Sequence, residues 1–174
     1  MPVNLFIMLG YPGAGKSNFA RHLAEEIKAV RFNGDSMRHG MFDEEEKRRD
    51  PGNNSMVFGA MDYSSSEVLK SGYSVIYDAS HNRKVDRLSA QNLASPFGIT
   101  PVIIWLKVPL EIAKDRAFNR ERSVDQPSIS EKRFDELVNS IEIPEANEKV
   151  ILIDGTKPFN EQMESFNSQL NVLS

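Results

Sequence analysis

Apolar and polar positions alternate along the chain with two different periods, which predict strands and helices in turn. Five short runs of apolar and β-branched residues predict strands at residues 3–9, 29–33, 73–78, 101–108 and 150–154. Between them, apolar residues recur at helical spacing and predict helices at residues 15–27, 56–70, 84–93, 110–120, 131–141 and 159–173. Strands that alternate with helices are typical of a parallel sheet with helices on both faces. We therefore expect one α/β domain that spans residues 1–174 and contains five parallel strands.

Two polar stretches interrupt this pattern. Residues 43–50 carry a run of charged side chains, which predicts a solvated helical turn, and Pro51-Gly52-Asn53-Asn54 predicts a loop. Residues 122–130 are polar and contain Pro127, so we expect a mobile segment there. Asp35 and the glycine-rich stretch after residue 9 follow predicted strands, and Asp78 ends one. Because ligands bind outside the carboxyl ends of parallel strands, these features are expected to converge on one site.

Composition narrows the class of protein. A chain of 174 residues with 40% hydrophobic and 26% charged residues fits one ordinary globular domain. The net charge of −4 argues against a broad nucleic-acid-binding surface, although a local basic groove is compatible with it. The absence of cysteine excludes disulfides, thiol catalysis and thiolate metal sites. No apolar run has the length of a membrane span, and we expect no membrane partner and a cytoplasmic location.

The stretch from Gly10 to Ser17 fits the phosphate-binding pattern G-x-x-x-x-G-K-[ST] at every fixed position, between a predicted strand and a predicted helix. Backbone N–H groups of such a loop point at a bound phosphate, and the helix N-terminus adds its dipole. Lys16 is expected on the β- and γ-phosphates, and the Ser17 hydroxyl on Mg²⁺. The expected nucleotide-binding residues are Gly10, Tyr11, Pro12, Gly13, Ala14, Gly15, Lys16, Ser17 and Asn18. The alternative is an ordinary glycine-rich turn.

Asp35 and Arg38 form a second candidate group. Asp35 could act as a general base that accepts the proton of an acceptor hydroxyl, or it could cap the helix that follows. Arg38 lies three residues further and would share a helical face with Asp35. It could pair with Asp35, bind an anionic group of the acceptor or of the transferring phosphate, or be a surface arginine.

Asp78 ends the third predicted strand, and its expected place is beside the strand that leads into the phosphate loop. In that position it would help Ser17 to hold Mg²⁺, whereas the alternative is a polar strand end. His81, Asn82 and Arg83 follow and could contact an acceptor or form a plain turn.

Three arginines precede the polar segment. Arg116 and Arg120 are four residues apart on one helical face, and Arg122 follows. One interpretation is a lid at about residues 116–133, whose arginines stabilise charge on the transferring phosphoryl group. The other is a solvated helix face with ion pairs to Asp115 and Glu121.

These motifs together resemble the small P-loop kinases. The stretch Asn33-Gly34-Asp35-Ser36-Met37-Arg38-His39-Gly40 is similar to one in adenylylsulfate kinases. The stretch Gly72-Tyr73-Ser74-Val75-Ile76-Tyr77-Asp78-Ala79-Ser80, with Arg87 downstream, is similar to the polynucleotide-kinase-like branch of predicted kinases. The resemblance covers residues 3 to about 155. Ser36 and the segment after Asp78 depart from the adenylylsulfate-kinase pattern, which argues against adenylylsulfate as the acceptor.

The resemblance implies a three-layer P-loop NTPase fold and a role for each matching residue. Asp35 would lie near the acceptor hydroxyl, and Arg38 would bind the acceptor or a phosphate. Asp78 would order the site or reach Mg²⁺ through water, and Arg116 and Arg120 would be the lid arginines.

Two functions stay open from the sequence. The first is a kinase that transfers the γ-phosphoryl of MgATP to the hydroxyl of a small metabolite or to the 5′-hydroxyl of a nucleic acid. The second is a nucleotide-dependent regulatory or binding ATPase that has no phosphate acceptor. The sequence lacks the N-K-x-D and D-x-x-G motifs of a regulatory GTPase.

Overall fold

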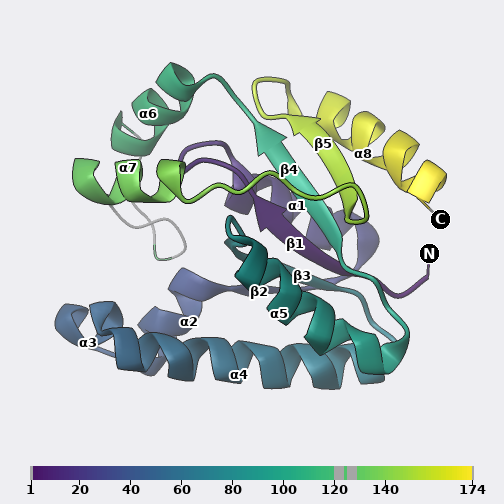
Figure 1. Ribbon diagram of the computed structural model, residues 1–174, viewed down its shortest axis with the longest axis horizontal. Helices are drawn as coiled ribbons and strands as arrows, with labels where there is room; N and C mark the ends of the chain where they lie inside the picture. The colour runs from purple at the N-terminus through teal and green to yellow at the C-terminus, as the bar shows by residue number, and fades with distance from the viewer. Residues whose placement is uncertain (1, 120–123, 125–128, 174) are drawn as a thin grey trace.

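The computed structural model describes residues 2–119, 124 and 129–173, and its centre is a five-stranded parallel sheet (Figure 1). The strands lie in the order β2-β3-β1-β4-β5. Their bounds are β1 Leu5–Leu9, β2 Val30–Asn33, β3 Val75–Ser80, β4 Val102–Lys107 and β5 Lys149–Asp154. The expected fold is confirmed, and β3 is paired with β1, which leads into the phosphate loop.

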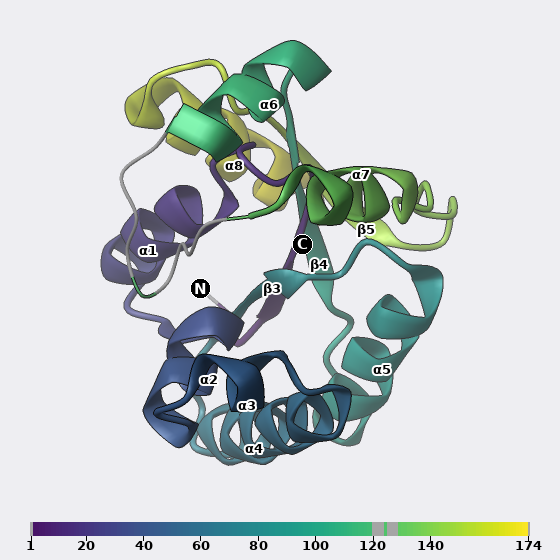
Figure 2. The ribbon, with the colours of Figure 1, turned by 90° about the vertical axis from the view of Figure 1, so that its left-hand side faces the viewer.

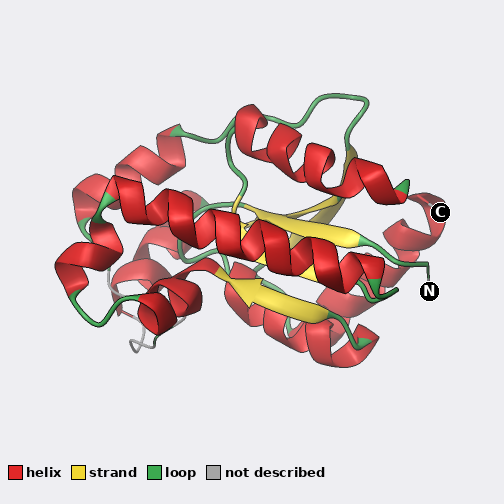
Figure 3. Ribbon diagram, turned by 90° about the horizontal axis from the view of Figure 1, so that it is seen from below, coloured by secondary structure: helices red, strands yellow, loops and turns green. Residues whose placement is uncertain are grey.

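Helices cover both faces of this sheet, as Figure 2 shows from the side. Their bounds are α1 Lys16–Ile27, α2 Gly34–Met41, α3 Glu45–Arg49, α4 Pro51–Lys70, α5 Lys84–Ala94, the 3₁₀ turn η1 Ser95–Phe97, α6 Leu110–Asn119, α7 Glu131–Asn139 and α8 Phe159–Leu173. Helices α1 and α8 pack on one face, and α4 and α5 pack on the other. The long helix α4 crosses the front of the sheet when the molecule is seen from below (Figure 3).

Strand β1 lies at the centre of the core, and its five residues are all buried. Phe6 and Met8 face the cluster built with α1, α6, α7 and α8, whereas Leu5, Ile7 and Leu9 face the cluster built with α4 and α5. A strand that is buried on both faces needs a continuous apolar sequence rather than an alternating one. This explains why residues 3–9 read as an uninterrupted apolar run.

The loop predicted at Pro51-Gly52-Asn53-Asn54 is wrong, because these residues form the first turn of α4. The Asp50 carboxylate accepts hydrogen bonds from the backbone N–H groups of Gly52, at 2.8 Å, and Asn53, at 3.1 Å. Proline is well suited to the first helical position, where no intrahelical N–H bond is required. The turn-forming residues are therefore used as a helix start.

Two further expectations concern the segment after α6 and the absence of a membrane span. Most of the stretch at residues 122–130, which was expected to be mobile, lies outside the described residues. Residues 124, 129 and 130 are described. Over the part of the chain that the structure covers, the helices are all too short or too polar to traverse a lipid bilayer.

Candidate functional site

The phosphate-binding sequence forms a tight loop between β1 and α1, and its backbone requires glycine. Gly10, Gly13 and Gly15 have φ angles of +139°, +82° and +96°, a region that other residues rarely adopt. A Cβ atom built on Gly13 would lie 2.1 Å from the backbone oxygen of Ala113 in α6. The loop is therefore packed directly against the backbone of another element.

Lys16 begins α1 and folds back over this loop. Its Nζ atom donates hydrogen bonds to the backbone oxygens of Gly10, at 2.8 Å, and Tyr11, at 2.7 Å. The first turn of α1 contains no acidic residue, so the positive end of the helix dipole is not opposed there. A positive charge, a helix N-terminus and a concave backbone together favour an anion such as a phosphate.

Ser17 and Asp78 meet beside the loop although they are far apart in sequence. The Ser17 hydroxyl donates to Oδ1 of Asp78 at 3.1 Å, and Asp78 is 4% exposed at the end of the β3 segment that pairs with β2. Hydroxyl and carboxylate oxygens are the ligands that Mg²⁺ prefers, and a single carboxylate suffices because Mg²⁺ keeps several waters. These two side chains therefore fit a magnesium site by their donor chemistry, and the role predicted for them stays a prediction.

Two residues of β2 also contact Asp78, and no motif in the sequence indicated these contacts. Arg31 donates to Oδ2 of Asp78 from Nε, at 2.9 Å, and from Nη2, at 2.6 Å. Asn33 Nδ2 donates to the same oxygen at 2.8 Å. Both residues belong to β2, in which Asn33 is paired with Asp78 in register. A charged residue inside a predicted strand was the available signal, but its partner depended on the strand order.

Asp35 lies in the first turn of α2, and it does not cap the helix. The cap is Asn33, whose side-chain oxygen accepts from the backbone N–H of Ser36 at 2.8 Å. The Asp35 carboxylate instead accepts from Nη1 of Arg38 at 2.9 Å, as one of the alternatives for Arg38 predicted. Partial burial raises the pKa of Asp35 above its ordinary value, and the nearby Asp78 charge adds to this, while the Arg38 guanidinium opposes it.

Helix α4 holds Arg38 from the other side. Asn54 accepts from Nε of Arg38 at 3.2 Å and from Nη2 at 2.5 Å. The guanidinium carbon lies 5.6 Å from the centre of the Phe58 ring. Asn54 was missed because residues 51–54 were interpreted as a loop. Phe58 lies inside the predicted helix 56–70, and it was missed because its contact with Arg38 depends on how α2 and α4 pack. Arg38 is thus fixed between α2 and α4 and is not a free surface arginine.

The segment after β3 contains one exposed and two buried side chains. His81 and Asn82 are buried, and burial lowers the pKa of His81 to about 4, so its ring is neutral near pH 7. Asn82 accepts from the backbone N–H of Gly10 at 3.4 Å and donates to the backbone oxygen of Leu137 at 3.1 Å. Arg83 is exposed and pairs with Asp86 at 2.7 Å. This arrangement fits the turn interpretation, in which Asn82 links the phosphate loop to α7.

Of the three candidate lid arginines, the structure describes Arg116. Its Nη1 atom donates to the backbone oxygen of Gly155, after β5, at 2.8 Å. Arg120 and Arg122 lie outside the described residues. A shared face of Arg116 and Arg120 therefore stays a prediction.

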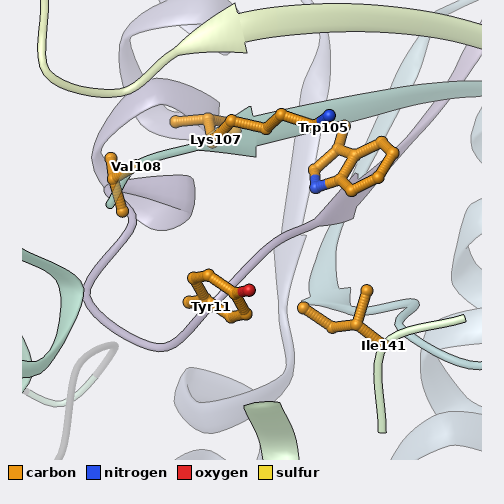
Figure 4. A pocket seen from close by; sticks show the side chains of 6 residues that line it. Tyr11, Trp105, Lys107, Val108 and Ile141 are labelled. Atoms are coloured by element: carbon orange, nitrogen blue, oxygen red, sulfur yellow. The ribbon is translucent and has the colours of Figure 1, made fainter. Parts of the chain in front are cut away.

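A pocket of about 260 Å³ opens on the β4 side of the phosphate loop, across β1 from Asp78 (Figure 4). Its lining is Tyr11, Trp105, Leu106, Lys107, Val108 and Ile141. The ammonium of Lys107 lies 4.0 Å from the centre of the Trp105 ring, a cation–π contact. The pocket thus combines aromatic and aliphatic side chains with one cation, and no pattern in the sequence predicts it.

Residues 5–144 match the sequence profile of a protein family described as an AAA domain. Comparison with curated proteins gives no match. Solved structures match along nearly the whole chain. A sugar kinase from Janibacter sp. HTCC2649 has a TM-score of 0.74 and 18% identity, over 98% of this chain and 95% of that one.

Two nucleotide-bound structures are also similar. Kti12 from Chaetomium thermophilum, in complex with ADP-AlF3, has a TM-score of 0.74 and 17% identity, over 98% of this chain and 99% of that one. The APS kinase CysC of Mycobacterium tuberculosis, in complex with AMPPNP and APS, has a TM-score of 0.67 and 15% identity, over 98% of each chain. At such identities the likeness establishes the fold, which is the three-layer fold of P-loop NTPases.

Proposed function

Because the chain belongs to this AAA-domain family of P-loop proteins, we propose that it is a kinase that transfers the γ-phosphoryl group of MgATP to a hydroxyl acceptor. The observation that carries the proposal is that Asp35 and Arg38 lie at the carboxyl ends of the strands, where the phosphate loop also lies. Lys16, Ser17 and Asp78 are at the same end of the sheet. A nucleotide-binding module needs the loop and its cation. It has no need of a further acid such as Asp35, whose pKa is raised and which pairs with Arg38.

Each residue has a part in the proposed reaction. The loop N–H groups and Lys16 hold the β- and γ-phosphates, and Arg116 with Arg120 would close a lid at about residues 116–133. Ser17 and Asp78 would hold Mg²⁺, which offsets phosphate charge when bound. Asp35 accepts the proton of the acceptor hydroxyl while the hydroxyl oxygen forms a bond to the γ-phosphorus. The bond between the γ-phosphorus and the bridging oxygen of the β-phosphate breaks, and ADP is released.

The acceptor is a small metabolite or the 5′-hydroxyl of a nucleic acid. The acidic balance of the chain favours the small molecule, whereas the resemblance to the polynucleotide-kinase-like branch favours the nucleic acid. The likeness to a sugar kinase supports the first option without deciding between them. We place this single kinase domain in the cytoplasm, in line with its lack of cysteine.

A second candidate is a nucleotide-dependent regulatory ATPase without an acceptor. The likeness to Kti12 is in line with it, because that complex contains ADP-AlF3, whereas the APS kinase complex holds APS beside its nucleotide. The two functions differ in what Asp35 must do, because a regulatory ATPase requires no base for an acceptor hydroxyl.

The deciding experiment measures ATP turnover with and without a panel of acceptors that includes a 5′-hydroxyl oligonucleotide, sugars and nucleosides. Wild type is compared with Asp35→Asn and with Asp43→Asn, a matched change at an exposed acid in the loop before α3. We expect acceptor-stimulated transfer, reduced by about 10²–10⁴-fold in Asp35→Asn and unchanged in Asp43→Asn. Acceptor-independent hydrolysis that is equal in all three proteins would instead support the regulatory ATPase.

The pH profile tests the role of Asp35 as a base. Because burial and Asp78 raise the pKa of Asp35, transfer should fall with decreasing pH at a midpoint above the ordinary value of 3.8. Arg38 opposes this rise, so Arg38→Gln should move the midpoint of kcat/KM to still higher pH. A midpoint that stays fixed in Arg38→Gln would contradict Asp35 as the titrating base.

A further inference from the structure

The two oxygens of the Asp78 carboxylate have very different surroundings. Among the residues that the structure describes, Oδ1 accepts one hydrogen bond, from the Ser17 hydroxyl at 3.1 Å. Oδ2 accepts three, from Nε of Arg31 at 2.9 Å, Nη2 of Arg31 at 2.6 Å and Nδ2 of Asn33 at 2.8 Å. The ion pair is shielded from solvent, since the side chains of Arg31 and Asp78 are 16% and 3% exposed. Water therefore competes little with these bonds.

This asymmetry limits how a cation can approach Asp78. A carboxylate oxygen offers about two lone pairs, and three donors already surround Oδ2. The guanidinium also places a positive charge on that side, where it repels another cation. Oδ1, which faces Ser17, is the oxygen left for a cation or for a water bound to it.

The number of carboxylate oxygens matters because metal ions differ in what they require. Ca²⁺ takes about 6–8 oxygen ligands and often binds both oxygens of one carboxylate, whereas Mg²⁺ is octahedral, keeps several waters and binds through one or two carboxylates. A site in which Asp78 offers one oxygen satisfies Mg²⁺ and leaves Ca²⁺ short of ligands.

We propose that Arg31 is a positioning residue that restricts Asp78 to a one-oxygen contact and thereby makes the site select Mg²⁺ over Ca²⁺. The inference rests on the proposed nucleotide-and-metal site at Ser17 and Asp78. Arginine suits the task because its planar fork supplies two N–H donors in fixed geometry, which lysine lacks. Strand β2 presents this fork beside β3, since Arg31 and Asn33 are two residues apart and therefore on one face of the strand.

The test measures binding of AMPPNP, which requires neither an acceptor nor turnover. Calorimetry gives the Kd of AMPPNP in saturating Mg²⁺, in saturating Ca²⁺ and in EDTA, and the EDTA value removes effects of Arg31 on the nucleotide alone. The quantity of interest is the ratio of the Kd in Ca²⁺ to the Kd in Mg²⁺. We expect Arg31→Met to lower this ratio by roughly tenfold, the lower end of what changes around a metal ligand do to metal affinity.

Two further variants sharpen the result. Arg31→Lys keeps the charge but loses the two-donor fork, so its ratio should lie between those of wild type and Arg31→Met, and it serves if Arg31→Met does not fold. Arg83→Met breaks an exposed ion pair to Asp86 and should leave the ratio unchanged.

The outcomes separate this inference from the proposed function. In one outcome, both metals change the Kd of AMPPNP for wild type, but the Arg31 variants keep the wild-type ratio or lose affinity equally in both metals. That outcome would overturn the role of Arg31 and leave the metal site standing. If wild type bound AMPPNP with the same Kd in Mg²⁺, Ca²⁺ and EDTA, the proposed metal site itself would be wrong. A failure to find any phosphate acceptor would count against the kinase and leave the binding ratio, and this inference, intact.

Discussion

Gly10 and Gly13 of the phosphate loop occupy positions where a side chain has no space. At Gly13 the φ angle is +82°, and an added Cβ would lie 2.1 Å from a backbone oxygen of α6. Gly59, in the middle of α4, has no atom within 4 Å of its added Cβ. The same chemical change should therefore have opposite effects at these two positions.

We predict that Gly13→Ala lowers the free energy of unfolding by at least about 1–3 kcal/mol, the typical strain of such a backbone conformation. Gly59→Ala should raise it by about 0.5–1 kcal/mol, because alanine loses less freedom in a helix. Urea unfolding of both variants measures the difference. If Gly13→Ala proved as stable as wild type, the close approach of the loop to α6 would be incorrect.

The sequence predicts residues whose position is local and misses those whose partners come from another element. The phosphate loop follows from eight consecutive residues, and the pairing of Asp35 with Arg38 follows from helical spacing. The contact of Arg31 with Asp78 depends on β2 lying next to β3, which periodicity alone does not determine. Local sequence patterns cannot encode such a long-range choice.

At the scale of elements, the start of α4 decides whether Arg38 is held in place. The Asp50 carboxylate caps this helix, and the first turn carries Asn54, which accepts from Arg38. Pro-Gly-Asn-Asn predicted a loop because all four residues favour turns. The acid that precedes them converts the same residues into a helix start.

We predict that Asp50→Ala destabilises the protein by about 1 kcal/mol, as loss of a helix cap typically does. Asp43→Ala is the matched control, because Asp43 is also exposed and Arg48 donates to its backbone oxygen rather than to its side chain. Thermal unfolding gives the comparison. Equal stability of the two variants would argue against the cap.

At the scale of the whole molecule, an ion pair connects Arg87 of α5 to Glu148, the residue that precedes β5. Arg87, whose side chain is 1% exposed, donates from Nε to Glu148 at 2.7 Å and from Nη2 at 3.1 Å. Burial acts to raise the pKa of Glu148, but the Arg87 hydrogen bonds and the N–H of Glu145 outweigh it, and the pKa lies below the ordinary 4.5. The folded protein thus binds fewer protons at Glu148 than the unfolded chain does.

The resulting stability is complete above pH 4.5 and is lost as the pH falls through the lower folded pKa. We predict that Glu148→Gln lowers stability at neutral pH by about 1–3 kcal/mol, less than for a fully buried pair because Glu148 is partly exposed. The gap to wild type should shrink in acid. Glu145→Gln, which affects the exposed pair with Lys84, should cost at most about 1 kcal/mol. Urea unfolding across this pH range would reveal a constant gap if the ion pair were unimportant.

The overall architecture was predictable, whereas its full strand order was not. Alternating strands and helices leave few options besides a parallel sheet, and the uninterrupted apolar run of β1 fits a strand that is buried on both faces. The pocket beside Trp105 requires knowledge of where residue 141 crosses the sheet, and no local pattern supplies that.

The close packing of the phosphate loop also determines when, during synthesis, the protein can first bind nucleotide. Gly10 lies against the backbone of Leu106, Gly13 against Ala113, and Gly155 against Ala14. A ribosome makes residues 10–17 well before residue 155. At about 5–20 residues per second, this interval is on the order of 10 s. A growing chain therefore displays the phosphate-binding sequence well before it can hold its shape, and nucleotide binding would mark a chain whose synthesis has passed β5.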